Sequence, residues 1–152
     1  MIGDAIGKPG RQAVEQVLPE LRMERDIDFV TANGENLAGG MGLTPSTAEA
    51  LFAHGVDVIT SGNHIWDKRE IYPYLDRTER VLRPLNYGTD GVPGRGWGTN
   101  QALDGSDIAV INLQGRTFMP PLENPFLAVR KELERVQSRA TVIVVDMHAE
   151  AT

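Results

Sequence analysis

Residues 44–67 read TPSTAEALFAHGVDVITSGNHIWD and encode a helix, a strand and a polar turn in direct succession. Thr44 and Pro45 are typical of the N-cap and first residue of a helix, and Gly55 is typical of the position that follows one. The apolar run from Val56 to Thr60 then predicts a buried strand. A helix that leads into a buried strand indicates an α/β fold.

The rest of the chain continues this alternation. Its apolar patterns predict further helices over residues 11–22 and 126–136, and strands over residues 27–32, 108–113 and 141–146. Asp67 and Glu70 have the spacing of a capping box, which predicts that Asp67 is the N-cap of a short helix. Residues 86–100 are rich in glycine and predict a long loop. The order of elements predicts one domain with a largely parallel sheet.

Composition limits the class of protein. The 152 residues are 41% hydrophobic and 24% charged, as in a globular domain, and the net charge of −6 argues against a stable nucleic-acid partner. The absence of cysteine excludes disulfides and cysteine-ligated metals. No apolar run approaches the roughly 20 residues of a membrane span. We therefore expect a soluble cytoplasmic protein, and a homo-oligomer remains open.

Polar side chains stand at the ends of four predicted strands. They are Asp4, the NGEN segment of residues 33–36, the pair Asn63 and His64, and the pair Asp146 and His148. Each has an ordinary structural interpretation, because Asp caps helices, Asn-Gly forms turns and a lone His often only packs. Open α/β sheets bind ligands at the carboxyl ends of strands. Carboxylate, amide and imidazole together suit Mn, Fe or Zn.

Six segments carry a resemblance to a known family: GDAIGKPGR (3–11), NGENLAGG (33–40), SGNHIWDK (61–68), LRPLNY (82–87), INLQGRTF (111–118) and DMHAEAT (146–152). With them the chain resembles the YmdB-type branch of the calcineurin-like metallophosphoesterases. The resemblance implies an α/β four-layer sandwich, in which helices flank two central β-sheets, and two divalent metal ions (Fe, Mn or Zn). It also implies hydrolysis of small phosphodiesters, in particular 2′,3′- or 3′,5′-cyclic nucleotides, by in-line attack of a hydroxide held by both metals.

The resemblance also assigns roles to individual residues. The implied metal ligands are Asp4, Glu35, Asn36, Asn63 and His148. Glu35 would bridge the metals, whereas His64 would be the catalytic residue that gives a proton to the leaving oxygen. Arg116 is a candidate for substrate binding and equally for anchoring a loop. His54 lies at the end of a predicted helix, where a structural role is expected.

Two features depart from the family pattern. Ala5 and Ile6 follow Asp4 where the wider superfamily has an Asp-x-His motif, and Asn36 is the substitute for that histidine. The family also continues with a Gly-Thr-His-Thr-His segment beyond Thr152. We therefore expect residues 1–152 to be one partial metallophosphoesterase domain, truncated at its C-terminus and by a few residues at its N-terminus. We also expect the strand at residues 141–146 to be left uncovered and these residues alone to have little activity. The alternative function is a regulatory protein that binds metal or nucleotide with little turnover, for which a proton donor at His64 has no use.

Overall fold

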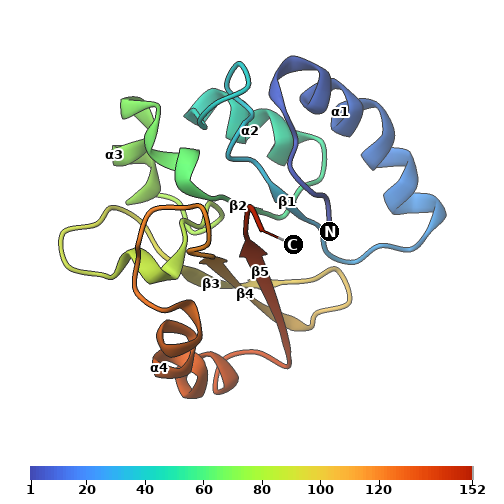
Figure 1. Ribbon diagram of the computed structural model, residues 1–152. Coiled ribbons are helices and arrows are strands. Elements are labelled where there is room, and N and C mark those ends of the chain that lie inside the picture. The colour runs from blue at the N-terminus through green and yellow to red at the C-terminus, as the bar shows by residue number, and fades with distance from the viewer. Residues whose placement is uncertain (152) are drawn as a thin grey trace.

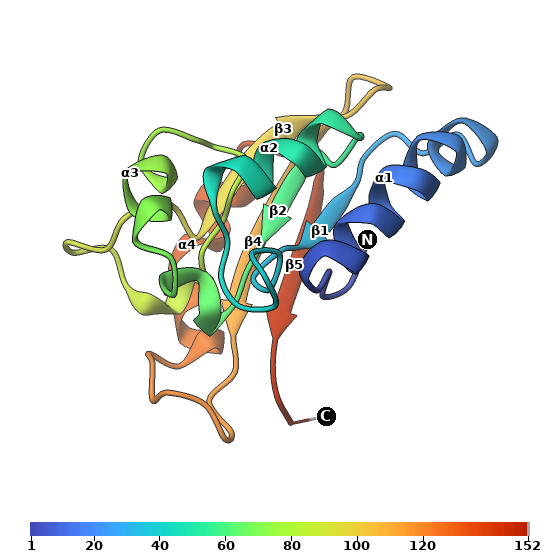
Figure 2. The same ribbon diagram turned by 90° about the horizontal axis from the view of Figure 1, so that it is seen from above.

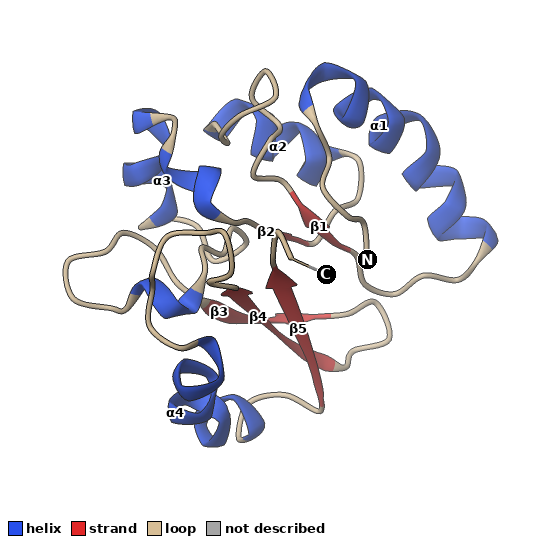
Figure 3. Ribbon diagram, viewed as in Figure 1, coloured by secondary structure: helices blue, strands red, loops and turns tan. Residues whose placement is uncertain are grey.

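The computed structural model describes residues 1–151, and its strands form two sheets that lie between helices (Figures 1 and 3). In the first sheet, β1 (Thr31–Asn33) pairs in parallel with β2 (Val58–Thr60). Single parallel bridges extend this sheet on both sides, from Ile2 to Ala32 and from Ile59 to Val81. All chain segments in the first sheet therefore run in the same direction.

The second sheet has three strands in the order β3 (Trp97–Gln101), β4 (Asp107–Gln114) and β5 (Val142–His148). β4 is antiparallel to β3 and parallel to β5. The prediction of a largely parallel sheet is therefore confirmed for the first sheet and for the β4–β5 pair, and wrong for β3.

Helices cover the outer faces of both sheets. They are α1 (Gly7–Glu24), α2 (Pro45–Ala53), the short α3 (Tyr72–Leu75) and α4 (Pro125–Gln137). One apolar cluster joins α1 and α2 to the first sheet, and another joins α4 to the second. Figure 1 shows α4 on the opposite side of the sheets from α1 and α2, and Figure 2 shows the same arrangement from above. The layers are thus helices, sheet, sheet and helix.

The two sheets contact each other through a mixed interface. Val58 and Leu82 from the first sheet pack against Ile108 and Val110 from the second. Asn112 of β4 is fully buried, and its Nδ2 donates to the carbonyl oxygen of Ser61 at 2.8 Å and to that of Leu82 at 3.1 Å. The Thr60 hydroxyl donates to the Asp146 carboxylate across the same interface.

The predicted helix start at Thr44 is confirmed. Thr44 Oγ1 accepts from the Thr47 amide at 3.2 Å, and Thr47 Oγ1 accepts from the Thr44 amide at 3.0 Å, so the two residues cap α2 reciprocally. His54 follows the last residue of α2, and its Nδ1 donates to the Ala50 carbonyl at 2.7 Å. This contact agrees with a structural role for His54.

Two other predictions need correction. The predicted loop over residues 86–100 contains the start of β3, which forms because its backbone pairs with β4 and not because of its own glycine-rich sequence. The strand predicted at residues 27–32 is shorter and later, at β1. The exposure of β5 agrees with the expectation that the strand at residues 141–146 is left uncovered, because Val142 and Val145 are nearly half exposed. Among residues 1–151, β5 is hydrogen-bonded to a strand on one side only.

None of the helices within residues 1–151 combines the length and the apolar character needed to cross a lipid bilayer.

Candidate functional site

The turn after β2 brings a glycine into close contact with two polar side chains. Gly62 directly precedes a 3₁₀-helix over Asn63–Trp66. A Cβ atom at Gly62 would lie 2.2 Å from Cδ2 of His148 and 2.3 Å from Oε2 of Glu35. A side chain at position 62 would therefore push His148 and Glu35 out of the positions they hold, and glycine permits their close approach.

Glu35 follows β1 and lies at the centre of this cluster. Its residue is 2% exposed, its Oε1 lies 3.2 Å from Nε2 of His148, and its Oε2 accepts from the His64 amide at 3.2 Å. Burial raises the pKa of the Glu35 carboxyl above its usual value, and the nearby His148 opposes that shift. Among residues 1–151, no lysine or arginine pairs with this buried carboxylate.

Asp4 and Asn36 form the exposed side of the cluster. Asp4 follows the short strand-like segment at Ile2, and its Oδ2 accepts from Nδ2 of Asn36 at 2.7 Å. The same Nδ2 lies 3.4 Å from Oε1 of Glu35. Asn36 therefore bridges the two carboxylates through its amide nitrogen, and a half-turn of that amide would present its oxygen instead.

His148 brings the second sheet into the cluster. It is the last residue of β5, and its Nε2 lies 3.2 Å from Oδ1 of Asn63. The structure therefore brings together all five residues to which the sequence assigns metal ligation, although they come from four separate segments of the chain. Whether they ligate metal stays a prediction.

His64 has a partner that the sequence did not indicate. Its Nδ1 lies 2.7 Å from Oδ2 of Asp67, and because a carboxylate only accepts, Nδ1 carries the proton. The prediction that Asp67 is a helix N-cap is wrong, because Lys68 is the residue that precedes the next 3₁₀-helix and neither it nor Asp67 caps that helix with its side chain. Residues three apart lie above one another in a 3₁₀-helix, which places Asp67 beside His64.

The donor set fits divalent metal ions. Two carboxylates, two amides and one imidazole converge, which is the mixture of oxygen and nitrogen donors that suits Mn, Fe and Zn. Within residues 1–151, no three side chains of the His, Cys, Asp and Glu types alone are grouped to hold a metal ion. The two asparagine amides would therefore have to take part in any metal site here.

Arg116 lies in the exposed loop that follows β4. The neighbouring Gly115 donates its amide to the His148 carbonyl at 2.7 Å, so the loop begins beside the cluster. A role for Arg116 in substrate binding stays a prediction.

The chain is similar to known proteins along its length. The family model for YmdB-like proteins matches residues 1–152. A Bacillus subtilis protein named 2′,3′-cyclic-nucleotide 2′-phosphodiesterase is 44% identical, over 99% of this chain and 56% of that protein. A crystal structure of a hypothetical protein from Thermus thermophilus is 41% identical with a TM-score of 0.88, and that of a novel phosphatase from Mycoplasma pneumoniae is 32% identical with a TM-score of 0.85.

Both structural matches cover 99% of this chain, but 57% of the Thermus chain and 54% of the Mycoplasma chain. The chain thus spans a little over half the length of these relatives. With a family model that matches every residue and two solved structures of the same fold, the chain belongs to the family of YmdB-like proteins.

Proposed function

We propose that the protein hydrolyses small phosphodiesters, with 2′,3′-cyclic nucleotides as the first substrate class to test. The observation that carries this proposal is the convergence of Asp4, Glu35, Asn36, Asn63 and His148 beside the His64–Asp67 pair. The name of the Bacillus relative gives independent support. The order of helices, sheet, sheet and helix fits the four-layer sandwich of the calcineurin-like metallophosphoesterases, to which we assign the fold.

The five convergent residues would hold two divalent metal ions, of Fe, Mn or Zn. When bound, these ions would supply Lewis-acid stabilisation of charge on the phosphate. Glu35 and Asp4 would bring negative charge to the cations, and the amide of Asn63 would add an oxygen donor without further charge. Because Gly62 has no side chain, Glu35 and His148 can approach each other closely enough to share a ligand.

His64 has the position of a proton donor. Its amide is held by Glu35 and its Nδ1 by Asp67, which leaves Nε2 as the nitrogen that can give a proton to the leaving oxygen. A carboxylate at Nδ1 fixes the orientation and the tautomer of the imidazole ring. Asp67 is thus a positioning residue. A protein that only binds metal or nucleotide has no need of such a pair, which favours an enzyme over a regulatory binder.

The test compares His64→Ala and Asp67→Asn with the parent protein, each in a version as long as its relatives, because little activity is expected of residues 1–152 alone. Because general-acid catalysis contributes about 10²–10⁴-fold, His64→Ala should lower kcat for a 2′,3′-cyclic nucleotide by at least about a hundredfold. Metal content, measured by elemental mass spectrometry, should stay close to that of the parent. Hydrolysis of bis(4-nitrophenyl) phosphate should fall less, because nitrophenolate leaves without a proton.

Asp67→Asn should lower kcat less than His64→Ala does, and again less for the nitrophenyl substrate than for the cyclic nucleotide. In a protein that already carries His64→Ala, Asp67→Asn should lower kcat little further, because Asp67 acts only through His64. His54→Ala is the matched control, since it removes a histidine at the end of α2 whose partners are the Ala50 carbonyl and Glu15 of α1, neither of which belongs to the candidate site. Unchanged turnover in His64→Ala, or equal losses for both leaving groups, would refute the assigned role.

A further inference from the structure

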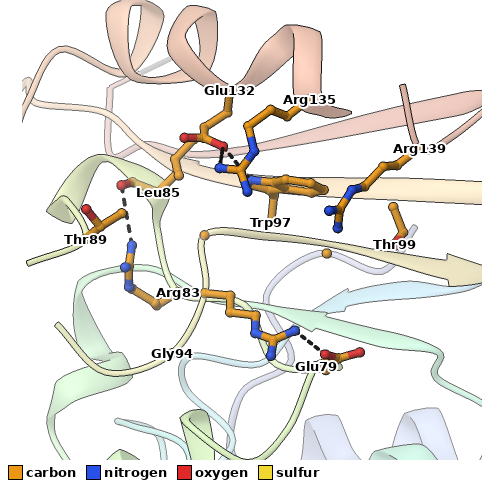
Figure 4. A pocket seen from close by; sticks show the side chains of 13 residues that line it. Glu79, Arg83, Leu85, Thr89, Gly94, Trp97, Thr99, Glu132, Arg135 and Arg139 are labelled. Carbon is orange, nitrogen blue, oxygen red and sulfur yellow. Dashed lines mark hydrogen bonds and ion pairs between the residues drawn. The ribbon is translucent and has the colours of Figure 1, made fainter. Parts of the chain in front are cut away.

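A recess lies on the outer face of the three-stranded sheet, apart from the metal-ligand cluster formed by Asp4, Glu35, Asn36, Asn63 and His148. It has a volume of about 360 Å³ and lies between α4, the start of β3 and the segment before it (Figure 4). This volume is within the range of small-ligand sites. Its charged and aromatic lining consists of Glu79, Arg83, Arg95, Trp97, Glu132, Arg135 and Arg139. We call it the arginine groove.

The arginine groove is separate from the metal-ligand cluster. Trp97 is opposite Ile111 in the register of β3 and β4, and both belong to the apolar cluster beneath α4. The next residue of β4, Asn112, faces the other way and contacts the first sheet. Since neighbouring residues of a strand point to opposite faces, the arginine groove and the interface between the sheets lie on opposite sides of β4.

Positive charge exceeds negative charge in this groove. Glu79 pairs with Arg95. Glu132 pairs with Arg135 at 2.9 Å, as Figure 4 shows. Among residues 1–151, no carboxylate forms an ion pair with either of the two other arginines, Arg83 and Arg139. The protein as a whole carries a net charge of −6, so this excess is local.

Arg83 is the less usual of these two arginines. Its residue is 1% exposed, and its guanidinium donates to the carbonyl oxygens of Pro84 at 3.0 Å and Pro93 at 3.3 Å. These are neutral acceptors, and burial alone lowers the pKa of Arg83. A buried cation without a counter-ion is costly to maintain. An anion bound in the groove would supply the missing charge.

Trp97 provides a flat apolar surface beside these charges. The guanidinium carbons of Arg135 and Arg139 each lie 5.8 Å from the centre of its ring system. Glu132 accepts from Trp97 Nε1 at 3.1 Å and also pairs with Arg135, which fixes both side chains relative to each other. Indole and guanidinium planes are surfaces on which nucleobases stack, and guanidinium groups match phosphate in geometry.

We infer that the arginine groove binds a nucleoside monophosphate, with the phosphate facing Arg139 and the base against Trp97. Arg83 is buried, so it contributes its charge from the wall of the groove without contacting the phosphate directly. A single nucleotide fits better than a nucleic-acid strand, because the surplus charge is confined to this groove in an acidic protein. The site is independent of the proposed hydrolysis and needs no metal.

Calorimetric titration of the purified protein with AMP, in the presence of a metal chelator, tests this inference. Arg139→Ala should weaken binding by roughly tenfold or more, since a charged hydrogen bond to phosphate is lost. The matched control is Arg130→Ala, which removes an exposed arginine of α4 outside the groove and should leave binding unchanged. Equal losses in both variants, or no binding by the parent protein, would overturn the inference.

Three further ligands identify what is recognised. Adenosine and inorganic phosphate should each bind much more weakly than AMP, because adenosine lacks the phosphate and inorganic phosphate lacks the base. If phosphate binds as well as AMP, Trp97 contributes nothing and the assignment to a nucleotide is wrong. If a 5′-phosphorylated RNA pentamer binds at least about tenfold more tightly than AMP, the site is for a strand end and not for a free nucleotide.

The same titration with Asn63→Ala separates this site from the metal-ligand cluster. AMP binding should be unchanged in that variant. Loss of binding would place the nucleotide in the cluster and overturn the role of the groove, while leaving the proposed hydrolysis intact. Conversely, an Arg139→Ala protein that binds AMP weakly but hydrolyses cyclic nucleotides normally would separate the two functions.

Discussion

Glu35 shows how a single residue can oppose folding and still be suited to function. It is buried with a raised pKa, and its nearest cationic partner is a histidine. Keeping a carboxylate ionised in such a place costs free energy, which divalent cations would return on binding. Sites that carry out chemistry often contain this type of local conflict.

Glu35→Gln should therefore separate stability from metal binding. The folded pKa of Glu35 is raised, so the carboxyl favours folding when protonated, and this contribution is lost as the pH rises through that pKa. Near neutral pH, the variant without metal should have an unfolding free energy equal to that of the parent or up to about 1 kcal/mol higher, from urea titration. Its affinity for divalent metal should fall sharply.

Glu79→Gln, a change at an exposed residue in an ion pair, serves as the control and should alter neither property of the protein by much. A clear loss of stability in Glu35→Gln, measured without metal, would show that the Glu35 charge stabilises the fold.

For single residues, the sequence predicts which side chains belong to the candidate site better than it predicts which of them contact each other. Gly62, Asn63 and His64 attract attention because glycine, amide and imidazole adjoin a strand end. Asp67 does not, because its spacing to Glu70 is also that of a capping box. The 3₁₀ geometry that brings Asp67 to His64 depends on how the turn packs, and no local sequence pattern specifies it.

Between elements, one hydrogen bond connects the short α3 to α2. The Tyr74 hydroxyl donates to the Glu49 carboxylate. Burial and the adjacent Glu49 charge raise the pKa of Tyr74 to about 12. A folded pKa above the ordinary value of 10 means that the neutral phenol is favoured in the folded state, so its contribution to stability is complete below pH 10 and is lost toward pH 12.

Burial also raises the pKa of Tyr87, so the titration is done in a Tyr87→Phe background. There we expect phenolate absorbance to show a late step near pH 12 that is absent once Tyr74→Phe is added. Tyr72→Phe, a change at the first residue of the same helix, should retain that step. If the late step survives in Tyr74→Phe, the hydrogen bond to Glu49 does not control this titration.

The elements differ in how far their own residues specify them. α2 was predictable because Thr44 and Pro45 act locally, and the structure shows the same cap. β3 was not, because Gly96 and Gly98 suggest a loop, whereas pairing with β4 makes residues 97–101 a strand. For β5 the apolar run predicts a strand correctly, but its burial depends on neighbours that no local pattern names.

For the whole molecule, the junction between the sheets decides whether the candidate site exists. Asp4, Glu35 and Asn63 follow segments of the first sheet, whereas His148 ends a strand of the second. His148 lies opposite Gln114 in the register of β4 and β5. The sequence predicts that polar residues follow strands, but not which sheet each strand joins, so the distance between His148 and Asn63 could not be predicted.

Asn112→Leu should test the importance of this junction. The change removes two buried hydrogen bonds to the carbonyls of Ser61 and Leu82 and leaves both oxygens without that donor. The unfolding free energy should fall by about 2–4 kcal/mol, from urea titration. Asn100→Leu, at an asparagine of β3 that is not fully buried, is the control and should cost less. A loss below about 0.5 kcal/mol for Asn112→Leu would show that apolar packing alone joins the sheets.

The two tryptophans of the chain provide a separate signal for each site. Trp66 ends the 3₁₀-helix that begins at Asn63 and packs edge-on against Tyr72 and Tyr87, whereas Trp97 lines the arginine groove. Replacing one indole with phenylalanine leaves a single tryptophan, which can be excited at wavelengths where the three tyrosines do not absorb. Emission from Trp66 would then report events beside the metal-ligand cluster, and emission from Trp97 would report those in the groove, without any attached dye.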